Sequence, residues 1–141
     1  MSEWFSAGEP LASVSIDDRG LQYGDGLFET VAVRHGEPRL WGYHLERLAA
    51  GCKRLRLSVP DGRTLRNWLD GALHAAHTDT AYCVAKIIHT SGIAQRGYGR
   101  ANPTKGATYI GVFPSVPPAA ALYRDGVDTF ICETRLATGS A

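Results

Sequence analysis

Two side chains that could bind an anion, those of His44 and Arg47, stand three residues apart near the start of a predicted helix. Residues at this spacing share one helix face, and the free N–H groups at a helix start attract negative charge. Because a guanidinium is a planar donor that is always charged, this pair is a candidate anion site. A solvent-exposed arginine with no ligand is the commoner outcome, and the residues alone leave both interpretations open.

Further cationic residues lie in a predicted strand and in a polar, glycine-rich loop. Strand alternation places Lys86 on a face that is otherwise largely apolar, so the lysine lies either at a sheet edge or beside a cleft that takes an anion. The loop carries Arg96, Tyr98 and Arg100 and could close over a ligand. Surface arginines are common in loops, so this second candidate is weaker.

Other patterns that often mark function do not point to a site. Residues 24–26 (GDG) are too short for a phosphate-binding loop and predict a tight turn. The five histidines show no spacing typical of a metal centre, and His74 with His77 lacks a third ligand. We therefore predict no metal site.

The charge and hydropathy of the chain argue against nucleic acid and membrane partners. Its 141 residues include 15 Lys and Arg against 14 Asp and Glu, which leaves a net charge of +1 and no basic excess for binding phosphates. No apolar run approaches the roughly 18 residues that span a bilayer, and the N-terminus has no pattern of a secretory signal. An odd count of cysteines at wide spacing (Cys52, Cys83 and Cys132) predicts reduced, buried thiols and a cytoplasmic protein.

Hydrophobic periodicity predicts the elements that must position these residues. Strands are expected at residues 27–34, 81–90 and 107–113, with shorter ones at 11–16, 21–23 and 39–41. One amphipathic helix is expected from His44 to residue 55. A second is expected to follow Thr64, its predicted N-cap, and to end at residue 76. This order predicts an α+β fold with an antiparallel or mixed sheet and both helices on one side.

A proline-rich stretch marks a predicted domain boundary. We expect a small N-terminal domain over residues 1–113, an interdomain linker over 114–121, and the start of a larger domain over 122–141. Residues 126–136 have the pattern of a strand. A segment this short cannot bury a core of its own, so we expect it to be the first strand of an incomplete second domain.

Four motifs together resemble the fold-type IV pyridoxal-phosphate enzymes, also known as class IV aminotransferases. They are RGLQYGDGLFET at residues 19–30, HLERL at 44–48, QRGYG at 95–99 and CETRL at 132–136. Within that family the loop motif is most similar to the 4-amino-4-deoxychorismate lyases. The resemblance extends over essentially the whole chain and implies the small domain of this fold.

The resemblance also implies roles for individual residues. Arg47 matches the arginine that binds the phosphate of pyridoxal 5'-phosphate, and Thr30 matches an auxiliary catalytic position close to the cofactor. Tyr23, Lys86 and Arg96 match positions on the substrate side, where the carboxylates of a small-molecule substrate need cationic or hydroxyl partners. The family builds this site across a homodimer.

One departure from the family pattern concerns the Schiff-base lysine, which lies in the family's large domain beyond a segment that resembles residues 135–137. The lysines of this sequence, Lys53, Lys86 and Lys105, do not match that position. We therefore expect the 141-residue chain alone to be inactive. In its intact form the expected enzyme converts aminodeoxychorismate to 4-aminobenzoate and pyruvate, in folate biosynthesis. A branched-chain or D-amino acid aminotransferase and a non-catalytic dimerising module are the alternatives.

Overall fold

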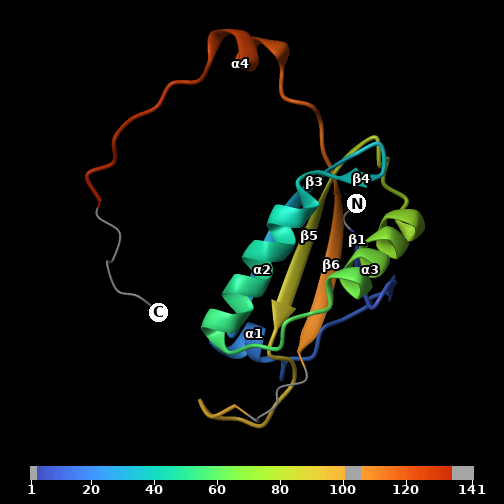
Figure 1. The fold of residues 1–141 in the computed structure, drawn as a ribbon, viewed down its shortest axis with the longest axis vertical. Coiled ribbons are helices and arrows are strands. Elements are labelled where there is room, and N and C mark those ends of the chain that lie inside the picture. Colours follow the sequence, from blue (N-terminus) through green and yellow to red (C-terminus); the bar gives the residue numbers. More distant parts are fainter. Residues whose placement is uncertain (1–2, 101–105, 135–141) are drawn as a thin grey trace.

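A computed structural model describes residues 3–100 and 106–134, and its main feature is one antiparallel sheet with two helices packed on one face (Figure 1). The strands are β1 (Glu3–Ser6), β2 (Glu9–Pro10), β3 (Gly26–Arg34), β4 (Glu37–Pro38), β5 (Tyr82–Thr90) and β6 (Ala107–Pro114). The helices are α1 (Arg19–Tyr23), α2 (Trp41–Leu55), α3 (Gly62–Ala75) and α4 (Ala120–Asp125). The strand order is β2-β1-β6-β5-β3-β4, which confirms the α+β prediction.

The long strands β3, β5 and β6 form the centre of the sheet, as their sequences predict. Thr30 on β3 pairs with Lys86 on β5, which pairs in turn with Gly111 on β6. Alternate residues point to the helices and are buried, and these are mainly Val31, Val33, Cys83, Ala85, Ile87, Ile110 and Val112. Lys86 therefore lies in the middle of the sheet on its other face, and the interpretation of this lysine as an edge residue was wrong.

The two long helices bury the stripes that their periodicity predicts, but both begin earlier than expected. In α2 the buried residues are Leu48 and Cys52, and the helix starts at Trp41 rather than at residue 44. In α3 the N-cap is Asp61, whose carboxylate accepts a hydrogen bond from the backbone N–H of Thr64 at 2.8 Å. The prediction of Thr64 as N-cap was wrong because the threonine donates to the cap residue instead.

The N-terminal region differs most from its predicted strands. Residues 11–16 form no strand, while β1 and β2 form a hairpin that the sequence pattern did not reveal. The predicted strand at 21–23 lies in α1, which is capped by Asp18 at its N-terminus and by Gly24, a residue with φ of 64°, at its C-terminus. Gly20 lets this short helix approach the sheet closely, since a Cβ atom there would lie only 2.3 Å from Thr90 Cγ2. The predicted hairpin is confirmed, with its return strand at 37–38 instead of 39–41.

The segment after β6 does not form the strand predicted for residues 126–136. Its described part, residues 126–134, is exposed and forms neither a helix nor a strand, and residues 135–141 lie outside the described residues. Residues 120–134 lie away from the sheet (Figure 1). A strand needs a hydrogen-bonding neighbour, and the sheet order β2-β1-β6-β5-β3-β4 contains no strand from residues 120–134. The division into residues 1–113, 114–121 and 122–141 stays a prediction.

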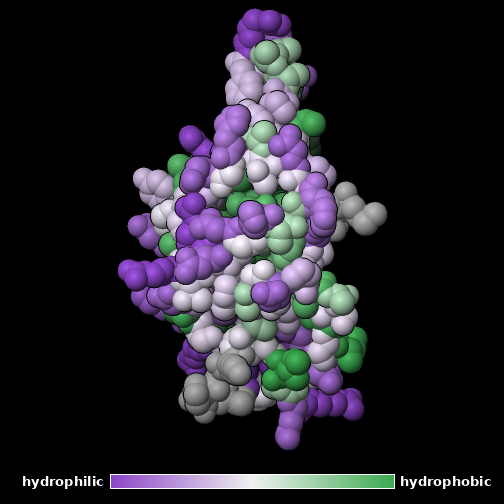
Figure 2. Space-filling model, turned by 90° about the vertical axis from the view of Figure 1, so that its right-hand side faces the viewer, coloured by the Kyte–Doolittle hydropathy of each residue, from purple (hydrophilic) through white to green (hydrophobic). Residues whose placement is uncertain are grey.

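Hydrophilic and hydrophobic residues are interspersed on the side of the molecule shown in Figure 2, and no helix in the described ranges is long and apolar enough to cross a membrane.

Cys52 and Cys83 are buried, and burial raises the pKa of both thiols. Cys132 is exposed, so the expectation that all three cysteines are buried was wrong.

A buried histidine at the end of β5 makes the stability of the fold depend on pH. The Nε2–H group of His89 donates to the carbonyl of Ser58 at 2.8 Å, so Nδ1 accepts from the hydroxyl of Thr108 at 2.9 Å. Burial lowers the pKa of this imidazole below its usual value of 6.5, against the opposing effect of the Ser58 carbonyl. Below pH 6.5 the unfolded chain therefore binds a proton more readily than the folded chain.

We expect the free energy of unfolding to fall as the pH is lowered from about 7.5 to about 5.5, by at most about 1.4 kcal/mol per pH unit from this one proton. Urea denaturation at several pH values measures this slope. The matched variant is His89→Gln, which keeps a donor and an acceptor but does not titrate in this range, and it should lose the contribution of His89 to the slope. The exposed His77, whose pKa is raised by Glu3, contributes with the opposite sign. An equal slope in both proteins would contradict the prediction.

Candidate cofactor and substrate site

The predicted anion site is built around a buried carboxylate that joins β3 to α2. Glu29, 2% exposed, points from β3 toward the helices. Its carboxylate accepts a hydrogen bond from Arg47 Nε at 2.8 Å and a second bond from Arg47 Nη2. His44 Nδ1 lies 2.6 Å from the same carboxylate. The three side chains form one cluster, which we call the Glu29 cluster.

Electrostatic interactions in the Glu29 cluster keep the Glu29 carboxylate and the Arg47 guanidinium charged. Burial alone would raise the pKa of Glu29, but hydrogen bonds and charge from Arg47 and His44 outweigh it and hold that pKa below its usual value. The same carboxylate raises the pKa of Arg47. The arginine side chain is 70% exposed, and no residue in the described part of the chain accepts from its Nη1. Glu29 therefore holds a guanidinium whose outer edge can bind a further anion.

The role of Glu29 was not predicted from the sequence, although the pattern of the strand contained a signal. The alternation along β3 places residue 29 on the same face as Val31 and Val33, which form the core. A carboxylate on a core face needs a charged or hydrogen-bonding partner. The sequence does not show that this partner comes from the next helix.

Thr30 and Lys86 lie together on the opposite face of the sheet. They are directly paired across β3 and β5, so their side chains are neighbours on one face. The ammonium group of Lys86 lies 4.7 Å from the centre of the Phe28 ring, which is 60% exposed. This face thus presents a cation, a hydroxyl and an aromatic ring that are not covered by the helices.

A pocket beside this face is mainly apolar. The sheet pocket has a volume of about 410 Å³ and lies between α1, with Leu21 in its wall, and the open face, with Phe28, Ile88 and Tyr109. Apolar walls of this kind can enclose the ring of a ligand, while the polar groups at the edge orient it.

Tyr23 and Arg96, which lie far apart in the sequence, line a second pocket. The loop pocket has a volume of about 570 Å³ and is lined by Asp17, Gln22, Tyr23, Arg96, Gly97 and Tyr98. The Tyr23 hydroxyl accepts a hydrogen bond from the backbone N–H of Gly97 at 3.0 Å. The helix α1 borders both pockets, with Leu21 in the wall of the sheet pocket and Tyr23 in the wall of the loop pocket.

The structure therefore brings the predicted residues together in two places. Thr30 with Lys86, and Tyr23 with Arg96, lie around the open face and α1, whereas Arg47 lies on the helix face of the sheet. Consecutive strand residues point to opposite faces, so Glu29 and Thr30 belong to different sides. Arg47, Thr30 and Lys86 line neither the sheet pocket nor the loop pocket. Any ligand that contacts both groups has to reach around the edge of β3.

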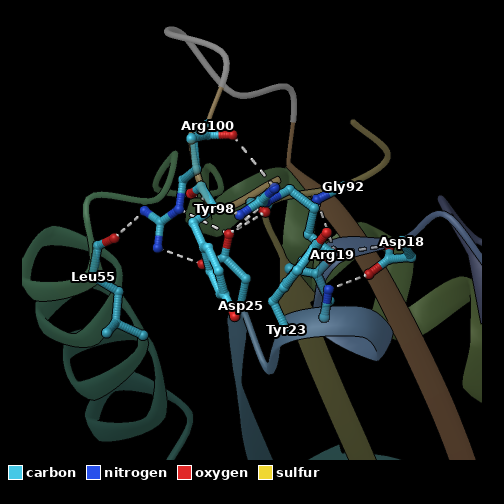
Figure 3. A network of polar contacts seen from close by, with 12 residues as sticks. Asp18, Arg19, Tyr23, Asp25, Leu55, Gly92, Tyr98 and Arg100 are labelled. Atoms are coloured by element: carbon cyan, nitrogen blue, oxygen red, sulfur yellow. Dashed lines mark hydrogen bonds and ion pairs between the residues drawn. The ribbon is translucent and has the colours of Figure 1, made fainter. Parts of the chain in front are cut away.

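A buried ionic network at the base of the sheet was also missed by the sequence analysis (Figure 3). Asp25, predicted only as part of a turn, accepts hydrogen bonds from Arg19, Arg100 and Ser91. Burial would raise the pKa of Asp25, but these three hydrogen bonds outweigh it and lower that pKa. No sequence spacing connects residues 25 and 100, so this network was not predictable from the pattern.

Comparison with known proteins identifies the family to which these features belong. The family model Amino-transferase class IV matches residues 26–139, from β3 almost to the C-terminal end. The chain belongs to this family. Class IV aminotransferases are pyridoxal-phosphate enzymes, so the resemblance inferred from the four motifs is confirmed. The 26–139 match leaves out the short helix α1 that borders both pockets.

Three relatives show how far the similarity extends. A solved 4-amino-4-deoxychorismate lyase from Pseudomonas aeruginosa is 41% identical, with a TM-score of 0.73, over 93% of this chain and 47% of that chain. An aminodeoxychorismate lyase from Vibrio harveyi is 33% identical over 129 residues, 92% of this chain and 46% of its own length. A hypothetical aminotransferase from Mycobacterium tuberculosis, solved in a PLP-bound form, is 25% identical, with a TM-score of 0.67, over 89% of this chain and 44% of that chain. The chain thus spans about half the length of these relatives.

Proposed function

We propose that the full-length protein carrying this chain is an aminodeoxychorismate lyase, which converts 4-amino-4-deoxychorismate to 4-aminobenzoate and pyruvate with pyridoxal 5'-phosphate as cofactor. The observation that carries the proposal is the 41% identity with the P. aeruginosa lyase over 93% of this chain. The product 4-aminobenzoate would assign the enzyme to folate biosynthesis. In this proposal the chain contributes one wall of the site in a homodimer.

The Glu29 cluster supports the cofactor assignment. Arg47 would bind the cofactor phosphate through the exposed edge of its guanidinium, because Glu29 occupies Nε and Nη2 and fixes the plane of the group. A phosphate dianion suits an arginine that is mostly exposed and permanently charged. When bound, the cofactor supplies an electron sink for the breaking of substrate bonds.

The open face and the loop pocket support a substrate with carboxylates. Lys86 and Arg96 would bind carboxylate groups, and Tyr23 would line the same side with its ring. The hydroxyl of Thr30, next to Lys86, would orient a substrate carboxylate. Alternatively, the Thr30 hydroxyl oxygen would relay a proton by accepting one and releasing another. The apolar wall formed by Phe28 and Ile88 suits the ring of the substrate.

An amino-group transferase is the second candidate. Its support is the similarity to the hypothetical aminotransferase from M. tuberculosis, which has the same fold over 89% of this chain. Both reactions use the same cofactor, and the open face could bind the carboxylate of an amino acid as well. The two candidates differ in their products rather than in the fold.

The deciding experiment measures the products that the full-length protein forms from aminodeoxychorismate. We expect pyruvate and 4-aminobenzoate in equal amounts, detected by a coupled pyruvate assay and by chromatography. Transfer of an amino group to a keto acid, without pyruvate release from aminodeoxychorismate, would reject the lyase and favour the aminotransferase. Inactivity toward both substrate classes would favour the non-catalytic module.

A further inference from the structure

We propose that Arg19 is a positioning residue that holds residues 96–100, here called the 96–100 loop, in the conformation that presents Arg96 to the substrate. The proposal rests on the proposed function for its substrate but not for the contacts themselves. Neither the composition of the loop nor the family motifs assign a role to residue 19. The role follows from where the guanidinium of Arg19 lies.

The guanidinium of Arg19 binds the backbone of three successive loop residues. Nη1 donates to the carbonyl of Gly97 at 2.7 Å and, more weakly, to that of Gly99 at 3.5 Å, and Nη2 donates to the carbonyl of Tyr98 at 3.2 Å. Figure 3 shows Arg19 in one network with Asp25, Tyr23 and Tyr98. Hydrogen bonds to carbonyl groups hold the loop backbone, whatever side chains the loop carries. They therefore determine the position from which the Arg96 side chain extends.

Arg19 is itself held rigidly. Its side chain is 3% exposed, Nε donates to Asp25 at 2.9 Å, and the guanidinium lies 4.6 Å from the centre of the Tyr23 ring. The same carboxylate binds Arg100 at the far end of the loop and the hydroxyl of Ser91 before it. One buried carboxylate thus connects the arginine to both sides of the segment that contains residue 96.

The loop has little burial of its own to hold it in place. Arg96 is exposed, and Tyr98 is 91% exposed. Gly97 has φ of 122°, a conformation that a residue with a side chain rarely adopts. With few buried apolar groups, the loop depends on polar contacts, and within the described structure Arg19 makes most of the side-chain contacts to residues 97–99.

The test uses the full-length protein with Arg19→Lys, which keeps the charge beside Asp25 but cannot reach three carbonyls at once. Limited trypsin digestion reports the loop directly, because trypsin cleaves after Arg96. We expect cleavage of the Arg96–Gly97 bond to become about tenfold faster relative to the Lys53–Arg54 bond inside α2. The helix bond serves as an internal reference, since general unfolding would accelerate both cleavages.

Two further variants make the digestion decisive. Tyr23→Phe removes only the hydroxyl that accepts from Gly97, and it should increase the same ratio by a smaller factor. Arg66→Lys, on α3 and far from the loop in sequence, should leave the ratio unchanged. An unchanged ratio in Arg19→Lys, or an equal increase in Arg66→Lys, would overturn the proposal.

Steady-state kinetics test the link to the substrate. For Arg19→Lys we expect KM for aminodeoxychorismate to rise about tenfold with a much smaller change in kcat, because a misplaced Arg96 weakens binding. A faster loop cleavage with unchanged KM would overturn the substrate part of the proposal. The digestion needs no substrate, so a failure of the lyase assignment would appear only in the product assay and would leave the loop result intact.

Discussion

Replacing Asp25 with alanine is expected to destabilise the protein by about 3 to 5 kcal/mol, the loss typical of a broken buried ion pair. The variant leaves the guanidinium of Arg19, 3% exposed, without its carboxylate, and removes the partner of Arg100 as well. Because Ser91 also donates to this carboxylate, the connection between β5 and α1 is weakened at the same time. Urea denaturation followed by circular dichroism measures the change in the free energy of unfolding.

The matched control for this prediction is Asp70→Ala. Asp70 accepts hydrogen bonds from Arg66 one helical turn away on α3, in a pair that is exposed to solvent. Exposed pairs of this kind contribute well under about 1 kcal/mol. A loss for Asp25→Ala no greater than that for Asp70→Ala would show that the buried network does not stabilise the fold.

Replacing Arg47 with alanine in the full-length protein is expected to weaken binding of pyridoxal 5'-phosphate by roughly 10- to 150-fold. This range corresponds to the loss of about 1.5 to 3 kcal/mol from charged hydrogen bonds. Arg47→Lys, which keeps the charge but not the planar donor group, should lie between the alanine variant and the unmodified protein. Equilibrium dialysis of the cofactor measures the dissociation constant without any need for turnover.

Controls for Arg47 must separate cofactor binding from folding, because the alanine variant removes the main partner of the buried Glu29. Combining Arg47→Ala with Glu29→Gln removes both charges and should restore stability but not cofactor binding. Lys53→Ala, an exposed residue on the same helix, should leave cofactor binding unchanged. Tight binding in the combined variant would exclude Arg47 as the phosphate ligand.

Much of the fold was predictable because its central elements have strong periodic patterns. The strand β5 alternates between the core face and the open face, and α3 repeats its apolar residues every three or four positions. The least predictable elements are short. A five-residue helix such as α1 has little periodicity, and its stability comes from the Asp18 cap and from contact with β5.

The site divides in the same way. Residue type and motif were enough to select Arg47, Thr30, Tyr23, Lys86 and Arg96 as candidates. Their grouping was not predictable, since Tyr23 contacts the loop at Gly97, which lies 74 positions further along the chain. The carboxylates that hold the arginines, Glu29 and Asp25, were missed because a buried charge is recognised by its partner, and the partners lie on other elements.

The amino-acid sequence alone therefore specifies the family, the α+β class and the face on which each residue of the long strands β3, β5 and β6 lies. Those properties depend on local periodicity and on motifs of contiguous residues. The tertiary structure was needed to show that Glu29 and Arg47 form one cluster on the helix face, while Thr30 and Lys86 meet on the open face. It was also needed to show that Arg19 binds the 96–100 loop. Hydrogen bonds and ion pairs between distant residues form only when the sheet brings its strands together, and no local pattern records them.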